Sequence, residues 1–279
     1  MNKRKKTMIS LFCVVIALCV LAGIIAFENK HLETNCYTIE NDKIPESFDS
    51  FKIAQISDLH NEEIGKDNEK LIAQLKSATP DIIVVTGDLI DSRKTDVEIA
   101  VKFMKEAVKI APCYYVNGNH EIRVLAEYEE LKNELYTLGV TILENNSVTL
   151  KQNDESITIM GINDSSSEDV FFDSAQTDIE TPTDDSFTIL LSHRPELFEL
   201  YTKYDYDLVF TGHAHGGQFR LPFVGGLYAP HQGFLPEYDS GLYEDSGTTM
   251  LVSRGVGNSI FPFRFNNRPE IIVAELKAQ

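Results

Sequence analysis

Short apolar runs that each stop at a polar motif limit the fold of this chain more than any other feature. Residues 81–86 are almost continuously apolar and are followed at once by Gly87-Asp88. Such a run is typical of a strand buried on both faces. Five runs of this kind end in motifs that hold five of the seven histidines: Ser57-Asp58-Leu59-His60, Gly87-Asp88, Gly118-Asn119-His120-Glu121, Ser192-His193 and Gly212-His213-Ala214-His215. The chain therefore requires a fold in which several strand ends meet.

Strands and helices alternate in the first half of the sequence. Apolar runs predict strands at 51–56, 81–86 and 113–116, and apolar residues at helical spacing predict helices at 68–77, 97–110 and 125–138. The second half is richer in strands, which we expect at 147–150, 157–161, 187–191, 207–210, 248–253 and 271–276. This strand–helix alternation predicts an α/β fold.

The N-terminus combines a basic cluster with a long apolar run. Residues 3–6 are all Lys or Arg, and the uncharged residues 8–27 are enough for one helix to cross a bilayer. A cleaved signal peptide is the alternative, but the run is long for one and no small-x-small cleavage site follows it. We expect a cytoplasmic tail and signal-anchor at 1–27, a spacer with one short strand at 28–50, and a single domain at 51–279. Because basic flanks stay in the cytoplasm, the domain is expected outside the cell membrane.

Beyond the anchor the chain is strongly acidic. Without residues 3–6 it has 21 basic and 43 acidic residues, a net charge of −22. Nucleic acid binding requires clustered Lys and Arg, so we expect no such partner. Between Asn163 and Ser186 lie eight acidic and no basic residues, which predicts a solvated loop or lid, with disorder as the alternative. Outside the apolar run only Cys36 and Cys113 remain, and their spacing indicates neither a disulfide framework nor a metal site.

The strand-end motifs offer carboxylate, amide and imidazole donors without thiolate. Asp58 and His60 are two residues apart, so strand alternation puts both on one side of the chain. Asp88 has two oxygens and could bridge two cations. Each motif alone has a structural alternative, such as a turn capped by Asn119 or a histidine satisfied in the core. Five together at the ligand-binding edge of a sheet favour divalent ions such as Mn²⁺, Fe or Zn²⁺.

Two such ions suit chemistry at a phosphoryl group. At roughly 3.5–4 Å apart they lower the pKa of a bridging water and clamp the phosphoryl oxygens. The sequence has no Walker loop or Gly-x-Gly-x-x-Gly fingerprint, and no Gly-x-Ser-x-Gly elbow. We therefore expect the nucleophile to be a metal-bound hydroxide and not a side chain.

The five motifs, in this order and spacing over residues 50–276, resemble the calcineurin-like metallophosphoesterase superfamily. The resemblance implies a four-layer αββα sandwich, here with an N-terminal transmembrane helix, and hydrolysis of a phosphate ester. It implies seven metal ligands: Asp58, His60 and His215 at one ion, Asn119, His193 and His213 at the other, and Asp88 bridging both. His120 would stand near the leaving-group oxygen as general acid or transition-state stabiliser. Glu121 would hold His120 in place or contact the substrate.

The C-terminal segment narrows the resemblance to a bacterial membrane-associated subgroup with YkuE- and YaeI-like phosphoesterases. It carries Ser253-Arg254-Gly255-Val256-Gly257, then Phe261-Pro262-Phe263-Arg264-Phe265 before Arg268-Pro269-Glu270. Some relatives are UDP-2,3-diacylglucosamine pyrophosphatases, a role that an outward-facing domain disfavours. We therefore expect a phosphodiester, phospholipid or envelope-linked phosphate as substrate. One hypothesis places Arg264 beside the substrate or the membrane surface; the alternative is a structural ion-pair partner among core phenylalanines.

Two functions of other kinds stay open at this point. The same fold could serve as a binding platform without catalysis, although no predicted ligand is missing. A hydrolase with one metal and a broken second site is the other. A UDP-2,3-diacylglucosamine-type pyrophosphatase remains an alternative substrate class if the domain is cytoplasmic.

Overall fold

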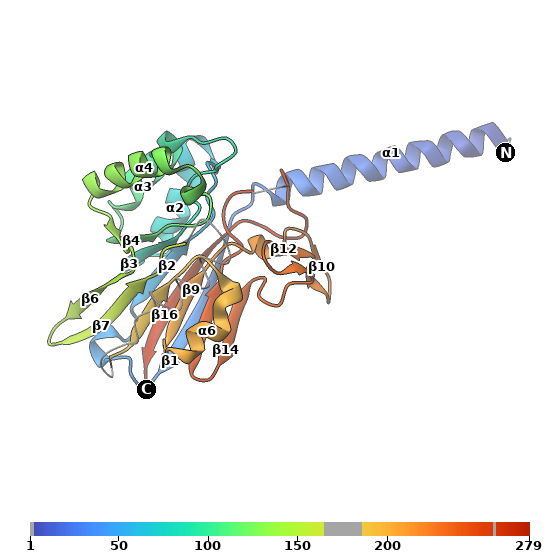
Figure 1. Cartoon of the computed structure of the whole chain (residues 1–279). Helices are drawn as coiled ribbons and strands as arrows, with labels where there is room; N and C mark the ends of the chain where they lie inside the picture. Colours follow the sequence, from blue (N-terminus) through green and yellow to red (C-terminus); the bar gives the residue numbers. More distant parts are fainter. Residues whose placement is uncertain (1–2, 165–185, 259–260) are drawn as a thin grey trace.

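Two six-stranded sheets packed face to face form the centre of the protein, with helices on their outer faces (Figure 1). The computed structural model describes residues 3–164, 186–258 and 261–279. The strand order is β1-β16-β2-β3-β4-β5 in the first sheet and β14-β15-β9-β8-β7-β6 in the second. Most of the acidic segment that we predict as a loop or lid, 165–185, lies outside the described residues.

The first sheet consists of β1 (Glu33–Asn41), β2 (Lys52–Ile56), β3 (Ile82–Thr86), β4 (Cys113–Val116), β5 (Thr141–Ile142) and β16 (Glu270–Ala278). The second consists of β6 (Asn146–Gln152), β7 (Glu155–Gly161), β8 (Thr188–Leu191), β9 (Leu208–Thr211), β14 (Gly241–Asp245) and β15 (Thr248–Val252). The helices are α1 (Lys3–Glu28), α2 (Glu69–Ser77), α3 (Val97–Ala107), α4 (Leu125–Thr137) and α6 (Phe198–Lys203). Two small hairpins pair β10 (Arg220–Leu221) with β11 (Gly225–Gly226) and β12 (Tyr228–Ala229) with β13 (Gly233–Phe234).

Strand alternation explains why the central strands are apolar throughout. On β3, Ile83 and Val85 pack against the helices α2, α3 and α4. Ile82 and Val84, between them in sequence, face the second sheet. A third cluster lies between the second sheet and α6. These three apolar layers separate helix, sheet, sheet and helix, which confirms the predicted four-layer αββα sandwich.

The strand β1 differs from the prediction. The sequence predicts a spacer at 28–50 with a short strand near 37–40, whereas β1 has nine residues and pairs in parallel with β16 along its whole length, from Glu33 opposite Glu270 to Asn41 opposite Ala278. Only Ile39 of β1 is fully buried. An edge strand with one buried side chain has little apolar pattern, and its partner is more than 200 residues away in sequence, so the pairing leaves no local signal.

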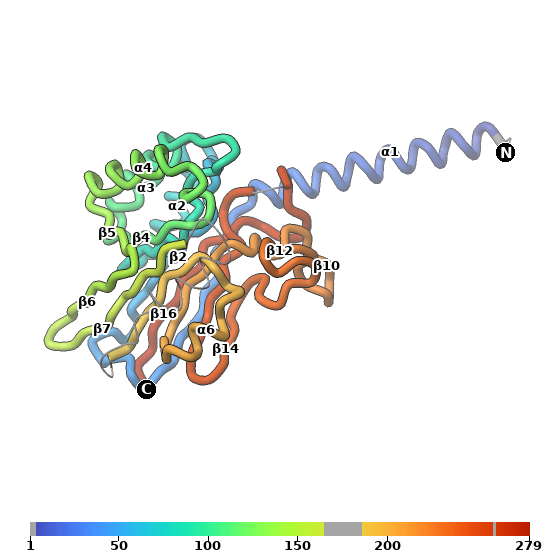
Figure 2. Tube along the Cα trace, in the orientation of Figure 1, coloured from blue at the N-terminus to red at the C-terminus, as the bar shows by residue number. Residues whose placement is uncertain are grey.

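The helix α1 leaves the domain and extends away from it (Figure 2). Among the described residues it is the one helix long and apolar enough to cross a membrane. The segment that follows α1 is fixed to the domain. The Asn29 side chain donates to the Arg264 carbonyl at 2.9 Å and accepts from the Arg264 N–H at 2.7 Å. Arg268 pairs with Glu28 at the end of the helix.

Candidate metal centre

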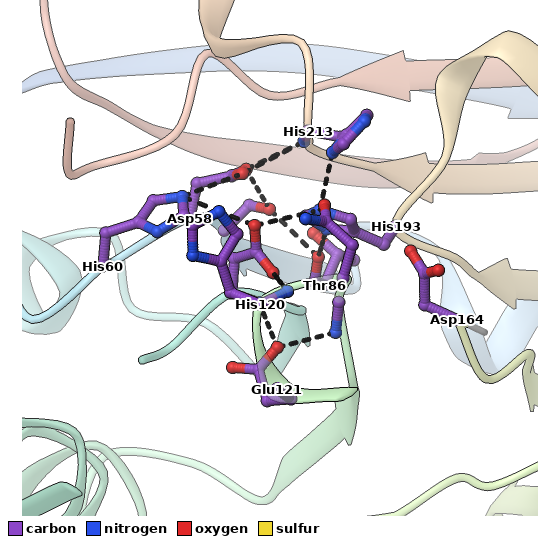
Figure 3. A network of polar contacts seen from close by, with 12 residues as sticks. Asp58, His60, Thr86, His120, Glu121, Asp164, His193 and His213 are labelled. Atoms are coloured by element: carbon purple, nitrogen blue, oxygen red, sulfur yellow. Dashed lines mark hydrogen bonds and ion pairs between the residues drawn. The ribbon is translucent and has the colours of Figure 1, made fainter. Parts of the chain in front are cut away.

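Five strand ends meet at the junction of the two sheets. The motifs after β2, β3 and β4 come from the first sheet, and those after β8 and β9 come from the second. All seven predicted ligands and His120 are buried there: Asp58, His60, Asp88, Asn119, His120, His193, His213 and His215. The donor atoms converge on one small region (Figure 3).

The first group of donors is Asp58, His60 and His215, whose ligand atoms lie within 4.8 Å of one another. Nε2 of His60 is 3.2 Å from Nε2 of His215. Asp58 Oδ1 is 3.7 Å from the former nitrogen and 3.4 Å from the latter. The other oxygen of Asp58 accepts hydrogen bonds from Ser57 Oγ and the His213 N–H, which fixes the carboxylate.

The second group is Asp88, His193 and His213, joined by Asn119. His193 Nδ1 lies 2.8 Å from the Thr86 carbonyl, to which it donates, so its Nε2 lone pair faces the site. His193 Nε2 is 3.0 Å from His213 Nδ1 and 3.2 Å from Asn119 Oδ1. Thus two ring nitrogens and the Asn119 amide point at one position.

Asp88 lies between the two groups. Its Oδ2 is 3.4 Å from His60 Nε2 and 3.3 Å from His193 Nε2. Its Oδ1 accepts the His120 N–H at 2.8 Å. One carboxylate oxygen is therefore within reach of both groups, while the other holds the backbone of the third motif.

Two glycines allow this close approach. A Cβ atom at Gly118 would collide with the Asp88 carboxylate, and one at Gly212 would collide with Ser57 Oγ and Asp58 Oδ2. Glycine in these motifs therefore brings the backbone of one strand end against the carboxylate of another.

Burial and neighbouring charges perturb the pKa values of these groups. Burial lowers the pKa of His215 to about 3 and that of His213 well below its usual value. Burial would also lower the pKa of His193, but the adjacent Asp88 outweighs it and raises this pKa to about 10. Burial would raise the pKa of Asp88, yet His193 and His120 hold it well below its usual value. The Asp88 carboxylate is thus ionised and requires positive charge beside it.

The donor set fits divalent cations. The Asn119 side-chain amide lies 3.2 Å from His193 Nε2 and 2.8 Å from His213 Nδ1, and it faces the two rings with its oxygen or, when turned over, with its nitrogen. With the amide oxygen turned to the rings, this oxygen and two unprotonated ring nitrogens form a set of acceptors that a cation would satisfy. A cation there would supply the positive charge that protonated His193 otherwise provides beside Asp88. Oxygen and imidazole donors without thiolate suit Mn²⁺, Fe or Zn²⁺.

His120 is oriented by a residue that the motifs do not include. Its Nδ1 accepts the Ser92 backbone N–H at 3.0 Å and lies 3.2 Å from Ser92 Oγ. A backbone N–H is a donor in every state, so the neutral ring carries its proton on Nε2. Burial lowers the pKa of His120 to about 4, which keeps the ring neutral near pH 7.

Glu121 and Arg264 do not occupy the positions suggested for them. Glu121 is fully buried and accepts backbone N–H groups from Asp88, Ile90 and Gly118, so it holds two motif loops together and does not orient His120 (Figure 3). Burial raises its pKa to about 8.

Arg264 is also fully buried. It donates to the carbonyls of Arg254 and Gly257, and its Nη2 is 3.4 Å from His215 Nδ1. Arg264 thus lies behind a predicted ligand, where no substrate reaches it.

A cavity of about 380 Å³ opens above the two groups. Besides predicted site residues, it is lined by Arg93, Arg123, Tyr228, Pro230 and His231, none of which the motifs indicate. Both arginines are exposed at its wall. Guanidinium groups beside a cationic site suit an anionic ligand.

His231 supports His213 from the second hairpin. The two imidazole rings are stacked with centroids 4.8 Å apart, and His231 Nδ1 lies 2.5 Å from Arg194 Nη1 and 2.6 Å from His213 Nε2. These contacts fix the plane of the His213 ring with its Nδ1 facing the site. Arg194 is held in turn by a bidentate pair with Asp164. Partners of this kind orient metal-binding imidazoles.

Comparison with known proteins gives one family and several relatives. The model of the calcineurin-like phosphoesterase family matches residues 51–217. The chain is 33% identical over 256 residues to the uncharacterized metallophosphoesterase YkuE of Bacillus subtilis, covering 88% of this chain and 86% of that protein. It is 28% identical over 231 residues to the phosphodiesterase YaeI of Escherichia coli, covering 81% and 82%. It is 27% identical over 249 residues to a transmembrane protein with metallophosphoesterase domain of Danio rerio, covering 85% of this chain and 55% of that longer protein.

Proposed function

The chain belongs to the calcineurin-like phosphoesterase family and is a metal-dependent hydrolase of phosphoester bonds, and from this premise we propose that its active site is a dinuclear metal centre. The similarity to YkuE and YaeI also confirms the predicted subgroup. Asp58, His60 and His215 would hold one ion, and Asn119, His193 and His213 the other. The observation that carries this proposal is the position of Asp88 Oδ2, within 3.4 Å of a ring nitrogen of each group.

When bound, the metal pair supplies Lewis-acid activation of a water and neutralises charge on the phosphoryl group. The protein's own part is to fix the donors before the substrate arrives. Thr86 sets the tautomer of His193, and His231 holds the ring plane of His213. Because Thr86 and His193 are fully buried, that contact needs little reorganisation on binding.

His120 would stabilise the departing oxygen by hydrogen bonding. Its proton is on Nε2, because Nδ1 accepts from Ser92. The ring lines the cavity, so this N–H is available to a leaving group there. A neutral imidazole donates a hydrogen bond without giving up its proton, which favours the role of transition-state stabiliser over general acid.

The cavity wall would select an anionic ester. Arg123 and Arg93, the latter paired with Asp91, line the cavity in a chain that is otherwise strongly acidic, so an anion meets less negative charge there than on the remaining surface. A phosphodiester is the substrate class we propose, and the relative YaeI is named a phosphodiesterase. Phospholipids and envelope-linked phosphates belong to this class.

We further propose that α1 anchors the domain to the cell membrane as an uncleaved, single-pass helix. Its length and apolar composition support this role, and one relative is named a transmembrane protein. The basic residues 3–6 favour a cytoplasmic N-terminus and an external catalytic domain.

Replacing the bridging carboxylate tests the dinuclear centre. In Asp88→Ala, hydrolysis of an aryl phosphodiester with Mn²⁺ should fall by at least about 1,000-fold, because both ions lose a shared ligand. Bound metal, measured by elemental analysis, should fall from about two equivalents to less than one. The exposed Asp154→Ala serves as matched control and should change neither. Unchanged turnover and metal content in Asp88→Ala would contradict the proposed site.

A further inference from the structure

Exposed apolar side chains gather in one part of the domain. Outside α1, ten large apolar residues are exposed in the described ranges, and seven of them fall in two short segments. We call these seven the apolar rim: Leu221, Phe223, Val224, Phe234, Leu235, Phe261 and Phe263. Phe223 and Phe234 are 109% and 84% exposed, so their rings extend fully into the surroundings. A group of exposed apolar side chains of this kind is typical of an interaction site.

The backbone conformation of two rim residues makes their exposure to solvent more unusual. Phe223 and Leu235 have positive φ angles of 67° and 56°. Asn or Gly adopts such a conformation at lower cost, and either would also be more soluble in an exposed turn. Bulky apolar residues at two strained, exposed turns therefore indicate that these side chains contact something other than water.

The rim also lacks negative charge. The segments 216–236 and 255–269, which contain it, have no Asp or Glu, although the chain has 43 acidic residues. A surface that contacts a bilayer must keep carboxylates away from the lipid headgroups and acyl chains. A protein partner would impose no such restriction.

Hydrogen bonds and ring contacts connect the rim to the end of α1. Gln218 donates to the carbonyls of Phe261 and Phe263, and the Phe219 ring lies against both phenylalanines. The next residue, Arg264, exchanges two hydrogen bonds with Asn29. Arg268 lies over the Phe27 ring, 5.8 Å from its centroid. The hairpins β10–β11 and β12–β13 accordingly lie on the side of the domain from which α1 departs (Figure 1).

The rim also adjoins the cavity. Tyr228 lines the cavity and contacts the exposed Phe234, with ring centroids 5.5 Å apart. The hairpin that carries both residues also carries His231. One wall of the cavity is therefore continuous with the apolar rim.

We propose that the apolar rim inserts into the bilayer surface beside α1 and that the substrate is a membrane lipid with a phosphate ester in its headgroup. The phosphate passes along the β12–β13 hairpin into the cavity while the acyl chains stay in the bilayer. Phenylalanine and tyrosine rings are well suited to this interface. The choice of lipid rests on the proposed phosphoesterase function, whereas the insertion of the rim does not.

Tryptophan fluorescence tests insertion independently of activity. The chain has no Trp, so Phe223→Trp and Phe234→Trp each introduce a unique probe. In full-length protein reconstituted into phosphatidylcholine vesicles, lipids brominated in the acyl chains should quench both probes. Tyr136→Trp, at an 80% exposed position on α4, should not be quenched. Equal quenching at all three positions, or none at 223 and 234, would overturn the proposal, as would failure of the protein to float with the vesicles.

Turnover of two substrates tests the lipid assignment. The variant Phe223→Asn/Phe234→Ser should keep turnover of a soluble aryl phosphodiester within about twofold. Its turnover of a phospholipid presented in vesicles should fall by at least about tenfold, and Tyr136→Ser should match the unmodified protein in both assays. Equal turnover of lipid by the rim variant and the control would overturn the substrate assignment. Absence of turnover on every phosphate ester in the unmodified protein would instead contradict the proposed function, and the fluorescence result would still decide on the rim.

Discussion

Five of the seven proposed ligands have left-handed backbone conformations. The φ angles of Asp58, His60, Asp88, His213 and His215 lie between 47° and 65°. Asp, Asn and His tolerate this region better than most residues, but each instance still costs free energy. Such a bend directly after a strand turns the side chain toward the junction of the sheets. The backbone conformation of these motifs is therefore part of how the site is built.

The support of His213 by His231 predicts a defect in metal affinity. In His231→Ala, the His213 ring loses the side chain stacked against it, so the Mn²⁺ concentration for half-maximal activity should rise about 10- to 100-fold. Activity should recover at high Mn²⁺, since no ligand is lost, and His231→Gln should restore part of the affinity. The other histidine outside the site, in His31→Ala, is the control. A loss of activity in His231→Ala that high Mn²⁺ does not reverse would contradict a positioning role.

The motif residues could be predicted because the type of their side chains carries the signal. Asp88 and His213 stand out as polar groups after apolar runs. Ser92 acts on His120 mainly through its backbone N–H, which any residue except proline would provide, so its identity indicates nothing. His231 lies in a hairpin, and its contacts with His213 and Arg194 arise only in the folded chain.

At the scale of elements, burial determines what the sequence reveals. The strand β4 is buried along its whole length and was predicted with its correct bounds, Cys113–Val116. The hairpin strands β10–β13 have two residues each, too few for any periodic pattern. These hairpins supply Tyr228 to the cavity, so one wall of the site could not be predicted.

Burial on β4 also predicts thiol reactivity. Cys113 is buried, and burial raises the pKa of its thiol to about 12, whereas Cys36 on the edge strand β1 is exposed. Because the thiolate is the reactive form, only Cys36 should react with a maleimide near pH 7.5 in a Cys13→Ser/Cys19→Ser background. Mass spectrometry should find one labelled thiol in the native protein and two after denaturation. Two labels in the native state would show that β4 is more open than described.

At the scale of the molecule, the site joins the two sheets. Three motifs come from one sheet and two from the other, so metal ions held by these motifs would connect the two halves of the sandwich. The sequence predicts one sheet edge with five donors. It does not indicate the division between sheets, because strands of both sheets pair in the same way with the next strand along the chain, β2 with β3 and β8 with β9.

Metal removal should therefore lower the stability of the whole domain. Ions present at about 1,000 times their Kd stabilise the folded state by about 4 kcal/mol. For a domain of this size, chelation should lower the Tm by roughly 10 °C. The Asp88→Ala variant should show a much smaller change on chelation, since it holds less metal. Equal Tm shifts in the two proteins would show that the metal centre does not stabilise the domain.

The short connection from Asn29 through Arg264 to His215 has a kinetic consequence. With α1 in the bilayer, as proposed, this connection would hold the site close to the membrane surface. Encounters with the proposed lipid substrate would then occur in two dimensions, at an effective concentration set by tethering. Turnover should follow the mole fraction of that lipid in the bilayer, and diluting it with inert lipid should slow the enzyme even when the amount of substrate per volume is unchanged.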